Sequence, residues 1–270
     1  MGAAVKAARA MIHMWEEPCL TGTGGCGAVF FSGCSLRCCY CQNRPISEGG
    51  FGKEISVRRL ADIFLELRDK GAGCLDLVTP THFTPSVLDA LDLVKDRLGI
   101  PVVWNLGGYE KTETLRLIEG YADIYLPDLK YLDSGLSAAY SKAPSYAAYA
   151  FPALQEMVRQ TGTPAFDENG LLKRGTLIRH LVLPGSRRDS MALLTELKRK
   201  LPEGSFLISI MSQYTPPKED TGFKDLNRRL TTMEYDSVVN LAAELGLKGY
   251  MQERRSAKEE YTPSFDLTGL

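Results

Sequence analysis

Short apolar runs alternate along the chain with longer segments whose apolar residues recur every three or four positions. The short runs have the length and composition of buried strands, and they lie at 26–33, 74–80, 101–108, 122–131, 176–185 and 206–217. Helical periodicity follows at 56–71, 85–99, 109–121, 189–201 and 233–246. This alternation predicts an α/β fold with a parallel sheet covered by helices, and both a doubly wound sheet and a partial barrel fit it.

Helix boundaries can also be predicted from single residues. Ser56 is a candidate N-cap for the first long helix, and Gly71 is a candidate stop signal. The stretch from 132 to about 160 is rich in Ala and Tyr and predicts helices that are broken near Pro144 and Pro152.

No linker-like segment interrupts the alternation, so we expect one domain over residues 1–270. An Asn-Gly pair inside 166–175 predicts a hairpin within it. The domain is expected to comprise an N-terminal extension at 1–27, a core at 28–247 and a polar C-terminal tail at 248–270.

Composition narrows the class of protein. Hydrophobic residues make up 44% and charged residues 24% of the 270 residues, and the formal net charge is -1. These values are ordinary for a globular protein and do not indicate nucleic acid as a partner. Lys6 and Arg9 interrupt the N-terminal apolar stretch, and no apolar run approaches the roughly 20 residues of a membrane span. We therefore expect a cytoplasmic protein without a membrane partner.

Four of the seven cysteines stand within eight positions, directly after the first predicted strand. Cys34, Cys38 and Cys41 have the spacing C-x3-C-x2-C, and Cys39 is an additional thiol. Three thiolates on one loop can hold three irons of a 4Fe–4S cluster and leave the fourth iron open to a ligand. Tyr40 is placed to shield such a cluster. A zinc site or inert buried thiols are the alternatives.

A glycine-rich segment before this loop imitates a nucleotide-binding motif. Gly22, Gly24 and Gly27 match G-x-G-x-x-G, with Glu48 about 20 residues further on. A dinucleotide site needs a strand before the glycines and a helix after them, whereas a strand follows here. We therefore expect these glycines to shape a turn, and we expect Cys19 and Cys26 beside them to be structural.

The cysteine spacing, with an aromatic residue before the last cysteine, resembles the signature of the radical S-adenosylmethionine (SAM) enzymes. The stretch "VFFSGCSLRCCYCQNRPIS" is similar to the glycyl-radical-enzyme activating enzymes, such as the pyruvate formate-lyase activating enzyme. "LVTPTHFTP", "LPDLKY" and "IRHLVLPG" resemble an uncharacterised branch of that group. The resemblance implies a partial (β/α)6 TIM-like barrel whose 4Fe–4S cluster cleaves SAM to methionine and a 5′-deoxyadenosyl radical. It also implies reduced flavodoxin or ferredoxin as the electron donor.

Other candidate cofactor-binding residues stand at the ends of the later strands. Asp128 and Lys130 are two positions apart, so a continuous strand points both to one face, where the alternative is an outward ion pair. Asn105 precedes Gly107 and Gly108, whose missing side chains would let a ligand approach the backbone.

The resemblance assigns roles to several of these residues and adds others. It places Asp128 and Lys130 beside the methionine end of SAM, with Lys130 as the partner of the SAM carboxylate. The further candidates that it implies are Asn43, Arg179 and, at a position matched by a histidine in relatives, Gln213 or Tyr214. Where relatives carry a Gly-Gly-Glu motif, this chain has Thr79, Thr81 and His82, of which His82 is alternatively an ordinary loop histidine.

The resemblance leads to one main functional hypothesis and two alternatives. The main hypothesis is a radical SAM enzyme that abstracts hydrogen from a glycine of a partner protein, a glycyl radical enzyme. The first alternative is a radical SAM enzyme that acts on a small metabolite or another polypeptide. The second is a non-catalytic iron–sulfur or zinc protein, although electron-transfer clusters favour four cysteine ligands.

Overall fold

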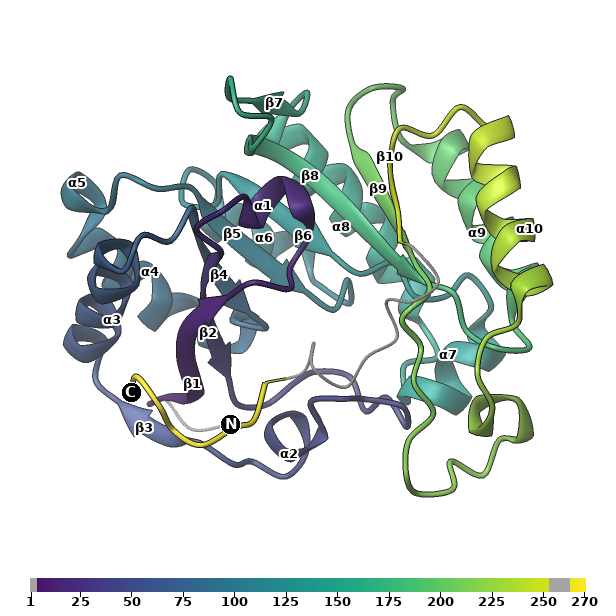
Figure 1. The fold of residues 1–270 in the computed structure, drawn as a ribbon, viewed down its shortest axis with the longest axis horizontal. Helices are drawn as coiled ribbons and strands as arrows, with labels where there is room; N and C mark the ends of the chain where they lie inside the picture. Colours follow the sequence, from purple (N-terminus) through teal and green to yellow (C-terminus); the bar gives the residue numbers. More distant parts are fainter. Residues whose placement is uncertain (1–3, 253–262) are drawn as a thin grey trace.

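The computed structural model describes residues 4–252 and 263–270, which fold around an open, mostly parallel sheet (Figure 1). The strand order is β10-β9-β8-β6-β5-β4-β2-β1-β3. The parallel strands are β2 (Cys26–Phe31), β4 (Cys74–Val78), β5 (Val102–Leu106), β6 (Ile124–Pro127), β8 (Leu172–Leu181), β9 (Leu207–Met211) and β10 (Gly249–Met251). All six predicted strands form. β10 adds a further parallel strand from a tail whose polar sequence did not predict one.

Two antiparallel strands extend the sheet beyond β2. β1 (Val5–His13) pairs with β2, and β3 (Lys53–Ile55) pairs with the outer edge of β1. Val5, Ala7, Ala8 and Ala10 of β1 are buried, which is why this short-side-chain segment packs as a strand. The segment at the start of the chain is thus part of the sheet, and Leu267 and Thr268 near the other end hydrogen-bond to its backbone.

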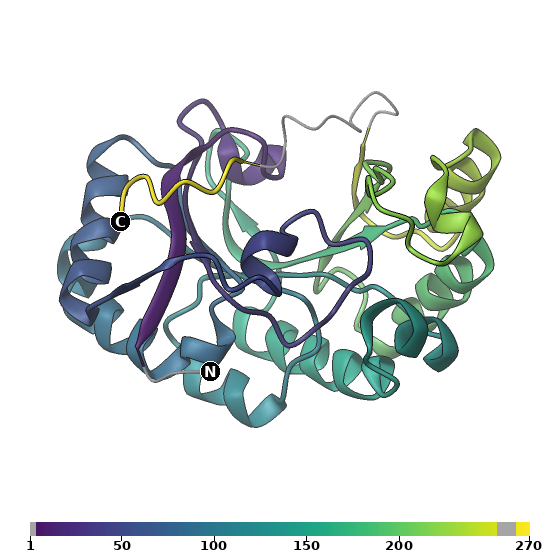
Figure 2. The same ribbon diagram turned by 90° about the horizontal axis from the view of Figure 1, so that it is seen from below.

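Helices cover the convex face of the curved sheet, as Figure 2 shows. The first long one, α3 (Val57–Asp69), begins where the Ser56 side chain accepts a hydrogen bond from the Arg59 N–H, which confirms the predicted cap. It buries Leu60, Ile63, Phe64 and Leu67. The others on this face are α4 (Thr84–Asp92), α5 (Lys95–Leu98), α6 (Thr112–Ile118), α7 (Ser134–Ser141), α8 (Tyr146–Thr161), α9 (Arg187–Lys200) and α10 (Thr232–Glu244).

The helical stretch after β6 differs from the prediction at one proline. α7 and α8 are separated around Pro144 as expected, but Pro152 lies inside α8, and the predicted second break is wrong. The cost of the missing N–H is offset by burial, because Ala150, Phe151, Ala153 and Leu154 around it are all in the core. The predicted hairpin forms between β7 (Ala165–Phe166) and β8.

The shorter elements connect these layers. They are α1 (Pro18–Thr21), α2 (Arg44–Ser47) and the 3-10 helices η1 (Thr81–Phe83) and η2 (Lys224–Asn227). The glycine-rich segment after α1 leads straight into β2, as expected of a turn and unlike a dinucleotide motif.

The sheet curves like a barrel but does not close, since β10 and β3 form its two ends. This confirms the predicted α/β fold in its partial-barrel form. The carboxyl ends of the parallel strands meet at one rim, where ligands bind in folds of this type. Within residues 4–252 and 263–270, no helix combines the length and the apolar character that crossing a membrane requires.

Candidate functional site

The cysteine loop leaves the carboxyl end of β2 and crosses the hollow side of the sheet before α2 (Figure 2). Two backbone hydrogen bonds fix it to the last turn of α7: Arg37 N–H donates to Ser141 O (3.1 Å) and Cys39 N–H to Tyr140 O (2.8 Å). These bonds also satisfy two carbonyls that a helix C-terminus leaves without partners. The loop is therefore held by the protein itself at its midpoint.

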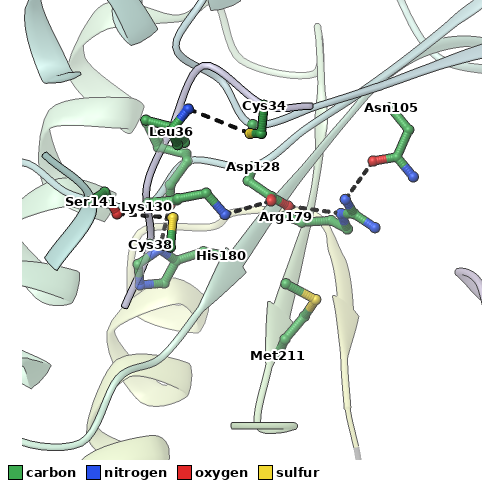
Figure 3. Close-up of polar contacts among 12 residues, drawn as sticks. Cys34, Leu36, Cys38, Asn105, Asp128, Lys130, Ser141, Arg179, His180 and Met211 are labelled. Carbon is green, nitrogen blue, oxygen red and sulfur yellow. Dashed lines mark hydrogen bonds and ion pairs between the residues drawn. The ribbon is translucent and has the colours of Figure 1, made fainter. Parts of the chain in front are cut away.

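Each of the three candidate thiols has a hydrogen-bonding neighbour. Leu36 N–H lies 3.4 Å from Cys34 Sγ, and Ser141 Oγ–H donates to Cys38 Sγ over 3.0 Å (Figure 3). Cys41 Sγ lies 3.4 Å from Ser47 Oγ. Hydrogen-bond donors around cysteine sulfurs are typical of iron–sulfur sites, where the thiolate accepts.

Three partly buried thiols on one anchored loop fit the donor set of a 4Fe–4S cluster. Among the residues that the structure describes, no three His, Cys, Asp or Glu side chains converge on a single metal position. A four-iron cluster does not require such convergence, because each cysteine binds a different iron. The candidate ligands therefore remain Cys34, Cys38 and Cys41. Burial raises the pKa of the metal-free Cys38 thiol to about 12.

Behind the loop, Asp128 forms ion pairs with two cations. Lys130 Nζ lies 2.7 Å from Asp128 Oδ2, and Arg179 Nε lies 3.0 Å from Asp128 Oδ1 (Figure 3). Burial by itself would raise the pKa of Asp128, but the charges of Arg179 and Lys130 outweigh it and hold the pKa below its usual range. The side chains of Asp128, Lys130 and Arg179 are only 14–20% exposed, so the alternative of an outward, solvated ion pair is wrong.

The network continues from Arg179 into the interior of the barrel. Arg179 Nη2 donates to Asn105 Oδ1 (2.7 Å), and Arg179 Nη1 pairs with Glu16 Oε1 (3.0 Å). Asn105 in turn donates to Glu16 and lies 3.5 Å from Asp76, whose pKa is raised well above its usual range, first by burial and then by Glu16. The planar guanidinium group of Arg179 thus donates hydrogen bonds to three separate segments, at Glu16, Asn105 and Asp128.

A cavity of about 220 Å³ lies between the cysteine loop and this ion-pair network. Six of the ten predicted cofactor-binding residues line it together with two of the predicted ligands: Tyr40, Asn43, Asp128, Lys130, Arg179 and Gln213, with Cys38 and Cys41. Tyr214, the alternative to Gln213, lines it as well. Asn105 does not line the cavity, but it accepts a hydrogen bond from Arg179, which does. The structure thus gathers most of the candidate residues that the sequence places on the cysteine loop and on several separate strands.

The residues that replace the Gly-Gly-Glu motif lie elsewhere. Thr79, Thr81 and His82 line a different cavity of about 520 Å³. Cys34 lies on that cavity too, so the three residues flank the cysteine loop from the other side. His82 Nε2 lies 2.8 Å from Ser32 O, which gives this loop histidine a hydrogen-bonding partner within the protein. A contact between these residues and SAM stays a prediction.

The two glycines after Asn105 serve protein packing. A Cβ atom at Gly108, which has a φ of +80°, would lie 2.0 Å from Asp128 O. A Cβ at Gly107 would lie 3.1 Å from Leu36 Cδ1 of the cysteine loop. Gly107 also lines the cavity of about 520 Å³, so the approach of a ligand to the backbone there stays a prediction.

Another cavity adjoins the candidate cofactor cavity of about 220 Å³. It has a volume of about 440 Å³ and shares Arg179, Met211 and Gln213 with the smaller one. Glu16 and Glu17 line it, and burial, followed by the charge of Glu16, raises the pKa of Glu17 to about 7. On the other side of Tyr40 and Cys41, a cavity of about 590 Å³ reaches the loop 215–219. Space for a reactant thus exists on both sides of the candidate cofactor cavity.

Sequence reasoning missed three polar residues of this site. Glu16 lies in the predicted N-terminal extension, and Ser141 and Tyr131 lie at or near the ends of α7 and β6. No motif or spacing marks them, because their roles depend on contacts across 10 or more residues in the folded chain. Glu16 carried one weak signal, an acidic pair directly before a helix that begins with Pro18.

One protein family matches the segment that contains the cysteine loop. Residues 20–132, less than half of the chain, match the family of the 4Fe-4S single cluster domain. This confirms the type of cluster that the cysteine spacing predicted.

Two relatives are similar to this chain over different shares of its length. An uncharacterized protein of Methanocaldococcus jannaschii is 28% identical over 245 residues, which are 87% of this chain and 66% of that protein. The pyruvate formate-lyase-activating enzyme of Clostridium pasteurianum is 29% identical over 131 residues, which are 45% of this chain and 53% of that enzyme. The chain spans about half to two thirds of the length of these relatives.

Solved structures share the fold. SuiB of Streptococcus suis, bound to its precursor peptide SuiA, superposes with a TM-score of 0.56 at 14% identity, over 82% of this chain and 47% of SuiB. The same protein bound to S-adenosylmethionine gives a TM-score of 0.54 at 15% identity, over 86% of this chain and 51% of SuiB. Residues 20–132 therefore match the family of the 4Fe-4S single cluster domain, and the chain shares its fold with the S-adenosylmethionine-binding protein SuiB.

Proposed function

We propose that this chain is a radical SAM enzyme that binds a 4Fe–4S cluster through Cys34, Cys38 and Cys41. The observation that carries the proposal is the cavity of about 220 Å³, which has Cys38 and Cys41 on one wall and the Asp128–Lys130–Arg179 network on the other. A cofactor placed there would contact both the cluster loop and a pair of cations. When bound, a reduced cluster with an open iron supplies the electron that cleaves SAM to a 5′-deoxyadenosyl radical.

The residues of this chain bind and orient the cofactor. The ammonium group of Lys130, which lines the cavity, would bind the carboxylate of the cofactor. Asp128 Oδ2 lies 2.7 Å from this group and holds it in place. Arg179 holds Asp128 in place from the other side. Tyr40, which is 8% exposed, closes the cavity beside Cys41 and limits the access of water.

The reaction that we propose is hydrogen abstraction from a glycine of a partner protein, which activates a glycyl radical enzyme. Support comes from the sequence motifs and from the 29% identity to a pyruvate formate-lyase-activating enzyme. SuiB, which has the same fold, binds a precursor peptide, so a polypeptide substrate is compatible with this architecture. Reduced flavodoxin or ferredoxin would supply the electron, and the oxygen-sensitive cluster fits a cytoplasmic location.

Cleavage of SAM tests the proposal directly. The full chain is reconstituted with iron and sulfide without oxygen, reduced with dithionite and mixed with SAM, and 5′-deoxyadenosine is quantified. Cys38→Ala should abolish the product, whereas Cys39→Ala, which removes the neighbouring thiol of the same loop, should retain it. If wild-type protein that carries a four-iron cluster forms no 5′-deoxyadenosine, the catalytic proposal is wrong and the non-catalytic iron–sulfur alternative holds.

A second arm tests the substrate. The reduced, SAM-loaded protein is incubated with pyruvate formate-lyase of Clostridium pasteurianum, and the glycyl radical is sought by electron paramagnetic resonance. A radical signal that depends on Cys38 supports glycine as the target. Product formation from SAM without any glycyl signal would instead favour a small metabolite or another polypeptide.

A further inference from the structure

Three hydroxyl groups form a continuous chain that ends at a candidate cluster ligand. Tyr40 OH lies 2.5 Å from Tyr131 OH, Tyr131 OH lies 2.7 Å from Ser141 Oγ, and Ser141 Oγ lies 3.0 Å from Cys38 Sγ. The last link is visible in Figure 3. These residues come from the cysteine loop, the segment after β6 and the end of α7, so no sequence motif connects them.

The ligand at the end of the chain decides the direction of every hydrogen bond in it. A metal-bound thiolate accepts hydrogen bonds only, so Ser141 must use its single hydrogen on Cys38. Ser141 then accepts from Tyr131, and Tyr131 accepts from Tyr40. Hydrogen bonds that run in one direction polarise one another, which strengthens the final bond to sulfur.

The chain is shielded from water. Ser141 and Tyr131 are each 1% exposed. Burial keeps the local dielectric low, so a donor aimed at sulfur has a larger electrostatic effect than it would have at the surface. The two backbone bonds from the cysteine loop to Tyr140 and Ser141 fix the donor relative to its acceptor.

We propose that the chain Tyr40–Tyr131–Ser141 sets the reduction potential of the cluster through the hydrogen bond from Ser141 to Cys38. The reduced cluster carries one more negative charge than the oxidised cluster, and that charge is shared with the cysteine sulfurs. A donor at Cys38 Sγ therefore stabilises the reduced form more than the oxidised form and raises the potential. Ser141 is in this sense a positioning residue, and the inference rests on the proposed cluster.

Redox titration of the reconstituted full chain without SAM tests this inference. Ser141→Ala should lower the ratio of reduced to oxidised cluster at a fixed potential about tenfold, which is a shift of about 59 mV for one electron. Ser137→Ala is the matched control, because Ser137 is equally buried one turn earlier in α7 and bonds to Ser134 O instead. Ser141→Thr, which keeps the hydroxyl, should restore the potential.

Tyr131→Phe provides a second variant if Ser141→Ala does not fold. It should shift the potential in the same direction by less, because it weakens the bond to sulfur without removing it. Iron and sulfide analysis of each sample shows whether the cluster is present. A fully loaded Ser141→Ala variant with the wild-type potential would overturn the inference while leaving the proposed function intact. A wild-type chain that holds no four-iron cluster would overturn both.

Discussion

Arg179 Nε lies 3.0 Å from Asp128 Oδ1, and this ion pair joins the carboxyl ends of β6 and β8. The backbones meet at the same place, since Leu129 N–H donates to Arg179 O over 2.7 Å. The side-chain pair and the strand pairing therefore depend on each other, so the position of Asp128 at the candidate site is set by the sheet itself.

Asp128→Asn should destabilise the protein markedly. The substitution leaves the buried cations Lys130 and Arg179 without their shared carboxylate, and breaking a buried ion pair in this way costs about 3–5 kcal/mol of the free energy of unfolding. The melting temperature of the metal-free protein, followed by circular dichroism, should fall by roughly 6–20 °C. Asp69→Asn, at an exposed pair with Arg68, should change it by only about 1–2 °C. Equal losses in the two variants would show that the network contributes no special stability.

Glu110 should make stability depend on pH in the neutral range. Burial raises its pKa to about 8, so the folded protein keeps this proton at a pH where the unfolded chain, with an ordinary pKa of about 4.3, has lost it. The unfolded state then binds fewer protons than the folded state, and stability falls as the pH rises from about 5 to about 8.

Glu110→Gln removes this titration while preserving shape. The variant should therefore melt above the wild type at pH 8, and the difference should disappear toward pH 5. Melting curves of both proteins in buffers from pH 5 to pH 9 measure this. Two curves that run parallel across the whole range would contradict a buried, protonated Glu110.

Gly108→Ala should be far more damaging than a comparable change elsewhere. Both Gly108 and Gly120 have a left-handed backbone, with φ values of +80° and +86°. A Cβ at Gly120 meets nothing within 4 Å, so Gly120→Ala costs only the backbone strain of about 1–2 kcal/mol. A Cβ at Gly108 collides with Asp128 O, so Gly108→Ala must also displace the segment that carries the candidate site. Urea unfolding compares the two, and similar midpoints would refute the packing argument.

The parallel strands and most helices could be predicted because their signals are local. Each depends on apolar spacing within some 15 residues and on caps such as Ser56. β10 and the uninterrupted α8 could not be predicted, because tertiary packing decides both. Tyr250 of β10 pairs with Ser209 of β9, and the neighbours of Pro152 are in the core, so distant contacts outweigh weak local preferences.

The candidate site follows the same division. Cys34, Cys38 and Cys41 were identifiable as candidate ligands because their spacing on one short loop is a local sequence signal. Asp128 and Lys130 were candidates because parallel strands end at a common rim, whereas Arg179 was implied only by the resemblance to a known family. Glu16 and Ser141 could not be identified, since each acts through a side chain more than 100 positions away.

Within the part of the chain that the structure describes, the open sheet ends in two edge strands, and such edges in many proteins recruit strands of other molecules and lead to aggregation. Here the outermost strands among the described residues, β3 and β10, have three residues each. β3 also exposes Lys53 and Glu54. Short edges, one of them charged, offer few consecutive backbone groups to a neighbouring chain. The protein can therefore keep its sheet open without presenting a long edge as a template for fibre growth.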